Sequence, residues 1–135
     1  MRHKVNEAGL ADRILVDSAG TAGWHDGKPP HEGTRSILKQ YGIDDSGMRA
    51  RQVRRDDYTD FSYIIAMDDS NVSNLEDFAP DEHRVEVRKL LEFTSSGQGD
   101  VPDPYYTGNF EEVYAMVDEG CERLLGYICE REGLA

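Results

Sequence analysis

The sequence predicts an α/β fold, with a parallel sheet and helices on both of its faces. Residues 63–67 form a short, continuous apolar run, which is typical of a strand that is covered on both sides. Apolar residues from Phe110 to Ile128 recur with the helical period and predict a long amphipathic helix at the end of the chain. Because predicted strands and helices alternate along the chain, the strands are expected to run parallel.

The first third of the chain predicts a helix, a strand, a loop and a second helix. Residues 1–10 favour a helix that Gly9 ends, although no capping residue precedes it. Residues 14–16 are apolar and predict a strand, and residues 20–33 are rich in Gly and Pro and predict a loop. A helix is expected over residues 33–41, because Ile37, Leu38 and Tyr41 share a face and Gly42 follows.

The central part of the chain continues this alternation. The strand at residues 63–67 runs into Asp68, which opens a cluster of residues that favour helix starts. Val72, Leu75 and Phe78 then follow at helical spacing, and Pro80 closes that helix. Residues 85–91 predict a further strand.

Length and charge limit the classes of protein. The 135 residues are expected to form one domain, spanning residues 1–135. With 15 Lys and Arg against 27 Asp and Glu, the formal net charge is −12, which argues against nucleic acid and anionic membranes as partners. No apolar run reaches the length of a membrane span. Cys121 and Cys129 are too few for a disulfide framework and fit a reducing compartment, so the expected location is the cytoplasm.

One loop carries the clearest candidate for catalysis. In open α/β sheets, ligands bind at the carboxyl ends of the strands, where Ser18, Asp68 and the segment around Asp103 are expected. Asp103 lies between two prolines, which stiffen the backbone and hold a carboxyl group as a general acid requires. Tyr105 and Tyr106 follow as candidate aromatic walls. A structural turn with packed tyrosines explains the same residues, and that alternative stays open.

Several short motifs, taken together, resemble the low molecular weight protein-tyrosine phosphatases of bacterial type. Trp24, in the Gly-rich loop, matches an aromatic residue of that family. The other matches occur in the family's order: residues 16–21 (VDSAGT), 27–30 (GKPP), 50–52 (ARQ), 65–71 (IAMDDSN) and 103–106 (DPYY). The resemblance implies a three-layer, flavodoxin-like fold and hydrolysis of phosphotyrosine monoesters in a phosphoprotein or small aryl phosphate.

The family mechanism implied by this resemblance requires neither metal nor cofactor. A cysteine thiolate in a Cys-x5-Arg loop attacks phosphorus, while backbone amides and the loop arginine hold the phosphate oxygens. Asp103 stands at the position of the acid that protonates the leaving phenolate and then activates water. Trp24, Tyr105 and Tyr106 would flank the substrate ring, and Ser18 matches a serine that supports the phosphate loop.

The nucleophile loop of that family is not found in these 135 residues. The sixth residue after Cys121 is Tyr127 and the sixth after Cys129 is Ala135, so neither cysteine begins Cys-x5-Arg. The resemblance places the family's first, central strand and its phosphate loop ahead of Met1. We therefore expect an N-terminally truncated domain that lacks this strand, is inactive, and has a sheet edge open to self-association.

Three alternatives remain at this stage. A non-catalytic binding module could use Trp24, Tyr105 and Tyr106 as a recognition surface. Arsenate reductases share the fold but need a cysteine relay, which two cysteines in the last helix suit poorly. Protein-arginine phosphatases share it too, although paired tyrosines favour a phenyl phosphate.

Overall fold

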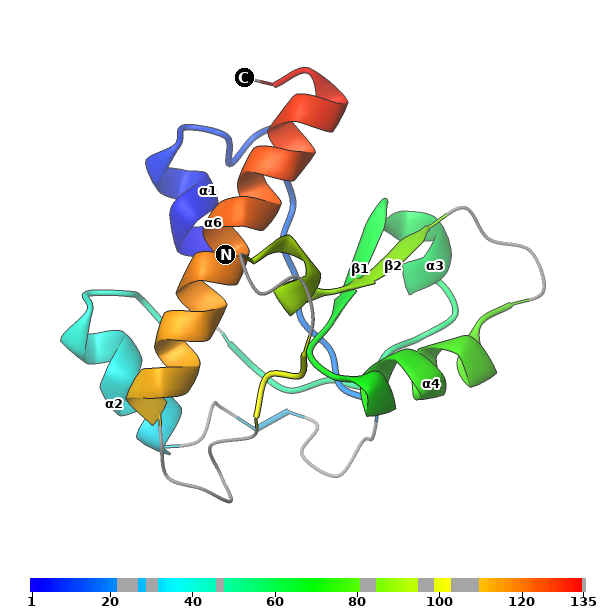
Figure 1. Cartoon of the computed structure of the whole chain (residues 1–135), viewed down its shortest axis with the longest axis horizontal. Helices are drawn as coiled ribbons and strands as arrows, with labels where there is room; N and C mark the ends of the chain where they lie inside the picture. The colour runs from blue at the N-terminus through cyan, green and yellow to red at the C-terminus, as the bar shows by residue number, and fades with distance from the viewer. Residues whose placement is uncertain are drawn as a thin grey trace.

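Eight helical and strand elements form the described part of the protein (Figure 1). This computed structural model describes residues 1–21, 27–28, 32–45, 48–80, 85–94, 99–102 and 110–134. The elements, in chain order, are α1 (Arg2–Glu7), α2 (Glu32–Gln40), α3 (Asp57–Asp60), β1 (Tyr63–Ala66), α4 (Asp69–Phe78), β2 (Glu86–Lys89), the 3₁₀-helix η1 (Leu90–Phe93) and α6 (Phe110–Glu132).

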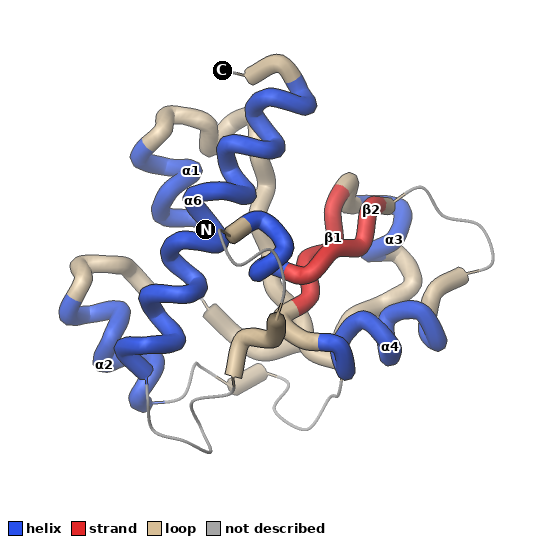
Figure 2. Tube along the Cα trace, viewed as in Figure 1, coloured by secondary structure: helices blue, strands red, loops and turns tan. Residues whose placement is uncertain are grey.

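Strands β1 and β2 pair in parallel, as the alternation of strands and helices predicts. Their register joins Tyr63 to Glu86 and Ala66 to Lys89. Helix α4 makes the crossover between them, because parallel neighbours need a connection that returns the chain to the same end of the sheet. Figure 2 shows the strands between α1 and α6 on one side and α3 and α4 on the other.

Each face of the sheet has its own apolar core, which confirms the predicted arrangement of helices on both faces. Successive residues of a strand point to opposite faces, so Tyr63 and Ile65 join the α6 side while Ile64 and Ala66 join the α3 and α4 side. The first core contains these residues: Leu90, Leu91, Val101, Val113, Cys121, Leu124 and Ile128. The second contains Val53, Tyr58, Ala66, Leu75 and Val85.

Helix α6 packs closely against η1 at a glycine. Gly120 is buried in the middle of α6, and a Cβ atom at this position would lie 2.6 Å from Cγ of Leu90. Leu90 is only 1% exposed, so its side chain is fixed by the surrounding core. The absence of a side chain at Gly120 is therefore what allows the helix to lie this close to η1.

Several predicted helix ends are confirmed by the structure. Gly42 follows α2 with a φ of +70°, a conformation that glycine adopts without the penalty of a Cβ atom. Asp68 caps α4, because its Oδ1 accepts a hydrogen bond from the Asn71 amide at 2.7 Å. No helix in the described ranges is long and apolar enough to cross a lipid bilayer.

The prediction of a strand at residues 14–16 is wrong. These residues form no ladder with described residues, and Leu15 is 80% exposed. The carbonyl of Val16 accepts instead from the Arg2 guanidinium at 2.7 Å. Apolar character predicts burial, whereas a strand also needs a neighbouring backbone to bond, and here only Gly20 forms a bridge, to Gln52.

Two further elements differ from the sequence prediction. The strand expected over residues 85–91 ends at Lys89, and Leu90 and Leu91 belong to η1. The Glu92 carboxylate accepts from the Lys89 amide and caps that turn. Helix α3 was not predicted, because its four residues are mostly polar and too few to show a helical period.

Candidate active site

The structure describes one of the five residues that the sequence singles out. Ser18 is exposed on the segment that follows residue 16. The other four, Trp24, Asp103, Tyr105 and Tyr106, lie outside the described residues. The candidate site is therefore described through the residues near them in the sequence, 17–21, 27–28 and 99–102, together with residues 67–71, which are bonded to 99–102.

The segment that carries Ser18 is bonded to the chain around Arg51. The Gly20 amide donates to the Arg51 carbonyl at 2.8 Å, and the Val53 amide donates to the Gly20 carbonyl at 2.8 Å. The Ser18 amide donates to Asp17 Oδ1 at 2.8 Å, so the Asp17 carboxylate lies against the backbone of the next residue. Ser18 is thus held by its backbone, and its position depends on residues more than thirty places further along the sequence.

Arg51 fixes this contact through a bidentate ion pair. Its two terminal nitrogens donate to the two carboxylate oxygens of Asp57 at 2.9 and 3.0 Å, and Nη2 lies 3.2 Å from Asp17. Asp57 is 4% exposed and also accepts from the Arg54 amide at 2.8 Å. Such a fork-to-carboxylate pair fixes orientation as well as distance.

The ion pair also determines the charge state of Asp57. Burial raises the pKa of its carboxyl group, but hydrogen bonds from Arg51 and the Arg54 amide outweigh it and hold the pKa below its usual value. The hydrogen bonds to Asp57 raise the pKa of Arg51 despite its partial burial. Both groups are charged at neutral pH, so the link between the Ser18 segment and α3 is ionic.

The second side of the site lies at the carboxyl end of β1. The Met67 amide donates to Asn71 Oδ1 at 3.1 Å, which closes the turn from the strand into α4. The Met67 carbonyl accepts from the Val101 amide at 2.8 Å. Val101 is 8% exposed, so the chain just before Asp103 is anchored both by a hydrogen bond and by burial.

Lys89, at the end of β2, joins two carboxylates at this edge. Its Nζ atom lies 2.8 Å from Asp69 Oδ1 and 3.0 Å from Asp100 Oδ1. Asp100 Oδ1 also accepts from the Asp69 amide, at 3.1 Å. Hydrogen bonds to Asp69 and then to Asp100 raise the pKa of Lys89. The carboxyl ends of both strands and the segment at Asp100 are therefore bound into one network.

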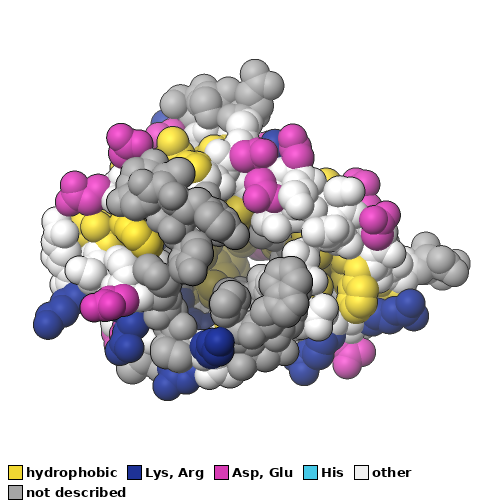
Figure 3. Space-filling model, turned by 90° about the horizontal axis from the view of Figure 1, so that it is seen from below, with side chains coloured by type: hydrophobic (Ala, Val, Ile, Leu, Met, Phe, Trp, Pro, Cys, Tyr) yellow, Lys and Arg dark blue, Asp and Glu magenta, His cyan; other side chains and the backbone are white. Residues whose placement is uncertain are grey.

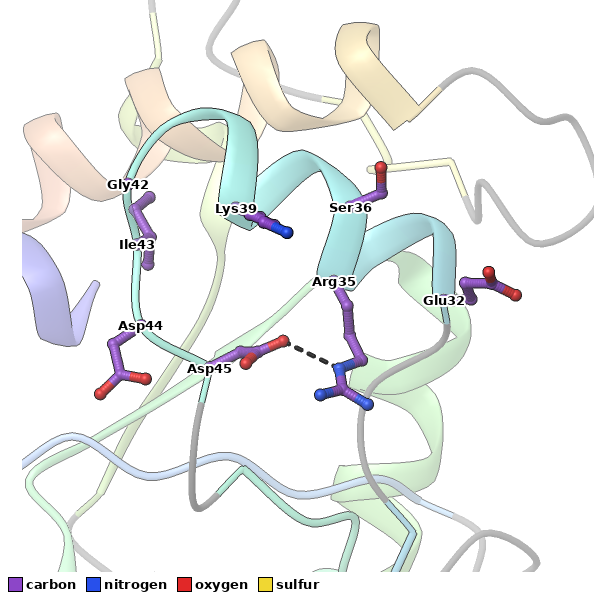
Figure 4. Close-up of a pocket in the computed structure, with 8 residues that line it drawn as sticks. All are labelled: Glu32, Arg35, Ser36, Lys39, Gly42, Ile43, Asp44 and Asp45. Atoms are coloured by element: carbon purple, nitrogen blue, oxygen red, sulfur yellow. Dashed lines mark hydrogen bonds and ion pairs between the residues drawn. The ribbon is translucent and has the colours of Figure 1, made fainter.

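A separate, open groove of about 850 Å³ lies beside α2 (Figure 4). Arg35 donates from Nε to Asp45 Oδ2 at 3.1 Å across it, and Lys39 lies on the same helix. Ser18, the one predicted site residue among those described, does not line this groove. Within the described residues, no three His, Cys, Asp or Glu side chains form a group that could hold a metal ion.

Sequence reasoning missed the residues that hold the site together. The motif at residues 50–52 contains Arg51, but its partner Asp57 lies in a polar segment without a recognisable pattern. Lys89 and Asp100 are far from each other in the sequence, and no local spacing links them. Only the position of Lys89 within a predicted strand, over residues 85–91, was a signal.

The fold and this site define a class of protein: a parallel α/β protein whose candidate chemistry lies at the carboxyl ends of the strands, where Asp100 and Val101 are anchored just ahead of the Asp-Pro-Tyr-Tyr sequence. The family described as low molecular weight phosphotyrosine protein phosphatase matches residues 1–133. The chain belongs to this family, which confirms the resemblance seen in its motifs.

Individual relatives agree with this membership. The low molecular weight protein-tyrosine-phosphatase YfkJ of Bacillus subtilis (strain 168) is 50% identical over 127 residues, which cover 93% of this chain and 81% of YfkJ. PtpA of Staphylococcus epidermidis is 46% identical over 134 residues, covering 99% of this chain and 84% of PtpA.

Solved structures agree as well. The crystal structure of YfkJ matches with a TM-score of 0.91 at 48% identity, covering 96% of this chain and 82% of that one. The crystal structure of a Drosophila arginine phosphatase matches with a TM-score of 0.84 at 31% identity, covering 93% and 83% of the two chains. These matches confirm the flavodoxin-like α/β fold implied by the resemblance.

Proposed function

We propose that this fold serves the hydrolysis of phosphotyrosine monoesters through a phosphocysteine, with Asp103 as general acid and then general base. The supporting observation is the anchoring of the residues just before Asp103. Val101 is bonded to the carboxyl end of β1, and Asp100 is paired with Lys89. Pro102 restricts the backbone between this anchor and Asp103, so the anchor limits where the carboxyl group of Asp103 can lie.

In this proposal each residue has one task. Asp103 gives its proton to the leaving phenolate oxygen as the thiolate sulfur bonds to phosphorus, and then takes a proton from the water that releases phosphate. Trp24, Tyr105 and Tyr106 flank the aromatic ring of the substrate. Ser18 supports the phosphate loop, and the bonds from Arg51 to Asp17 and Asp57 support its position.

The nucleophile is the part that these residues do not supply. Since neither Cys121 nor Cys129 begins a Cys-x5-Arg sequence, we propose that a polypeptide of these 135 residues alone has no phosphatase activity. Cys121 lies on α6 and is buried in the core, so it is unsuited to replace the nucleophile.

A chimaera tests the role of Asp103 separately from the inactivity of the 135-residue polypeptide. We would join a segment with the Cys-x5-Arg loop that the family resemblance implies ahead of Met1, and measure turnover of p-nitrophenyl phosphate by this chimaera and by the 135-residue polypeptide. The chimaera is expected to be active, and Asp103→Asn should slow it by about 10²- to 10⁴-fold, as loss of a general acid does. Turnover by the shorter polypeptide would contradict its inactivity, and an unaffected Asp103→Asn chimaera would contradict the role of Asp103.

Phosphoarginine is a second candidate substrate, because the structural match to the Drosophila arginine phosphatase is close. The two substrates differ in the group beside phosphorus, a flat phenyl ring or a guanidinium. The chimaera should prefer phosphotyrosine if Tyr105 and Tyr106 form aromatic walls, and a preference for phosphoarginine would reverse the assignment.

We also propose self-association through the outer edge of β1 and a location in the cytoplasm. Among described residues, β2 is the only ladder partner of β1, so its other backbone edge is available for pairing. Both cysteines are free thiols, which supports a reducing compartment. Sedimentation equilibrium is expected to show a mass that rises with concentration, and a constant monomer mass would refute the association.

A further inference from the structure

The charges of this protein are unevenly distributed along its sequence. Residues 28–55 contain seven Lys and Arg and only three Asp and Glu, a formal net charge of +4. The rest of the chain contains eight Lys and Arg and 24 Asp and Glu, a net charge of −16. All ten charged residues of the segment lie within the described ranges. A basic segment in so acidic a protein calls for a physical explanation.

Internal ion pairs neutralise only some of the cations in this segment. Arg51 is paired with Asp57 and Asp17, and Arg35 is paired with Asp45. The remaining five cations are exposed and form no ion pair with a described carboxylate; we call them the basic edge: Lys28, Lys39, Arg49, Arg54 and Arg55. Lys4, Lys89 and Arg131, outside the segment, all have carboxylate partners.

Lys and Arg side chains are concentrated on one border of the molecule (Figure 3). Figure 3 shows Lys and Arg side chains along the lower border of one face, and Asp and Glu mainly along the opposite border. Two of the cations are held together by the backbone, because the Ala50 amide donates to the Lys28 carbonyl at 2.9 Å and so brings Arg49 beside Lys28. Lys39 lines the open groove beside α2 (Figure 4).

Part of the basic edge adjoins described residues of the candidate active site. The Gly27 amide donates to the Ala50 carbonyl at 2.7 Å, so Arg49 stands beside Lys28, which follows Trp24 by four residues in the sequence. The Ser18 segment is bonded to residues 51–53, directly after Arg49 in the chain. A ligand that extends out of the site on this side would meet the basic edge first.

We propose that the basic edge binds an acidic segment of a polypeptide, the Asp- and Glu-rich sequence beside the phosphorylated residue of a protein substrate. This inference rests on the proposed function and adds the substrate class. Unpaired cations attract an oppositely charged segment and steer its approach, and they cost no internal ion pair when they bind it. A short acidic segment is attracted by these cations, whereas a nucleic acid or a membrane surface, which extends further, would also meet the strongly acidic remainder of the protein.

The test measures binding and needs no catalysis, so its failure is distinguishable from a failure of the proposed function. Fluorescence anisotropy would follow a dye-labelled peptide that carries a row of Glu and no phosphate, titrated with the 135-residue polypeptide at an ionic strength of about 0.1 M, where the Debye length is about 10 Å. Lys28→Glu/Arg49→Glu should weaken binding by about tenfold or more, and Lys39→Glu/Arg54→Glu should repeat the effect. Salt should weaken binding in the same way, because exposed charges are screened.

A matched control separates the effect of net charge from the effect of where the charges lie. Arg13→Glu/Arg123→Glu changes the net charge by the same amount at two exposed residues outside the segment. This variant should bind the peptide within about twofold of the parent, because distant exposed charges are screened. Weakening by Arg13→Glu/Arg123→Glu as large as that by the basic-edge variants, no binding of the peptide, or tighter binding of a single-stranded DNA of equal charge would each overturn the proposal.

Discussion

The close contact between Gly120 and Leu90 gives a stability prediction with an internal control. In Gly120→Ala the new Cβ would lie 2.6 Å from Leu90 Cγ and 3.0 Å from both of its Cδ atoms. Leu90 is 1% exposed and is packed in the core, so its side chain cannot turn outward to solvent without leaving that core. Overpacking of this kind costs about 1–3 kcal/mol, whereas replacing a helical glycine by alanine gains about 0.5–1 kcal/mol. The expected net loss is about 1–2 kcal/mol.

Gly126 supplies the matched control on the same helix. It is exposed, and a Cβ built there meets nothing within 4 Å. Gly126→Ala should therefore keep the helix-propensity gain of about 0.5–1 kcal/mol without any clash. The two variants have the same chemical change, so the difference between their unfolding free energies, about 2 kcal/mol, reports the packing at Gly120.

Urea denaturation followed by circular dichroism measures the free energy of unfolding of both variants. A double-mutant cycle then tests whether the contact with Leu90 causes the loss at Gly120. In a Leu90→Ala background the clash is removed, so Gly120→Ala should become neutral or stabilising. Leu90→Ala itself is expected to cost about 2–5 kcal/mol, and the cycle is measured at a temperature where it is still folded. Equal stability of Gly120→Ala and Gly126→Ala would refute the packing argument.

Three further predictions concern the buried polar groups. Asp57→Asn should cost about 1–3 kcal/mol because it breaks the bidentate pair with Arg51, while Asp60→Asn, exposed on the same helix, should be near neutral in the same urea titration. The pKa of Asp57 is lowered by folding, so its contribution is complete above the unfolded value of about 3.9 and is lost as pH falls through the lower folded value. The stability gap between the parent and Asp57→Asn should therefore close below about pH 4, and a gap that stays constant to lower pH would contradict the charge assignment. Tyr58→Phe should cost about 1 kcal/mol, because its hydroxyl donates to the Leu75 carbonyl at 2.6 Å, and Tyr41→Phe on the exposed end of α2 serves as its control.

The sequence predicted those features that depend on neighbours in the chain. An apolar run predicted strand β1. Asp68 predicted the start of α4, because the capping residue and the first turn of a helix are adjacent in sequence. Helix α6 was visible from its period alone. The candidate site residues were also found from local motifs, and Trp24, Asp103, Tyr105 and Tyr106 stay predictions that wait for the experiments above.

Features that depend on distant partners could not be predicted in this way. Residues 14–16 have the composition of a strand, yet strand formation requires a bonded neighbour, which composition does not reveal. The pairing of Arg51 with Asp57, the joining of Asp69 to Asp100 by Lys89, and the free cations of the basic edge all depend on which charges meet in space.

The amino-acid sequence by itself determined the fold class, the family and the candidate catalytic aspartate, because periodicity, caps and motifs are local properties of the chain. Only the tertiary structure decided which residues anchor that site, which glycine must stay without a side chain, and which cations remain available to a partner. The physical reason is that hydrogen bonds, ion pairs and packing act over a few ångströms in space, however far apart their residues lie in sequence.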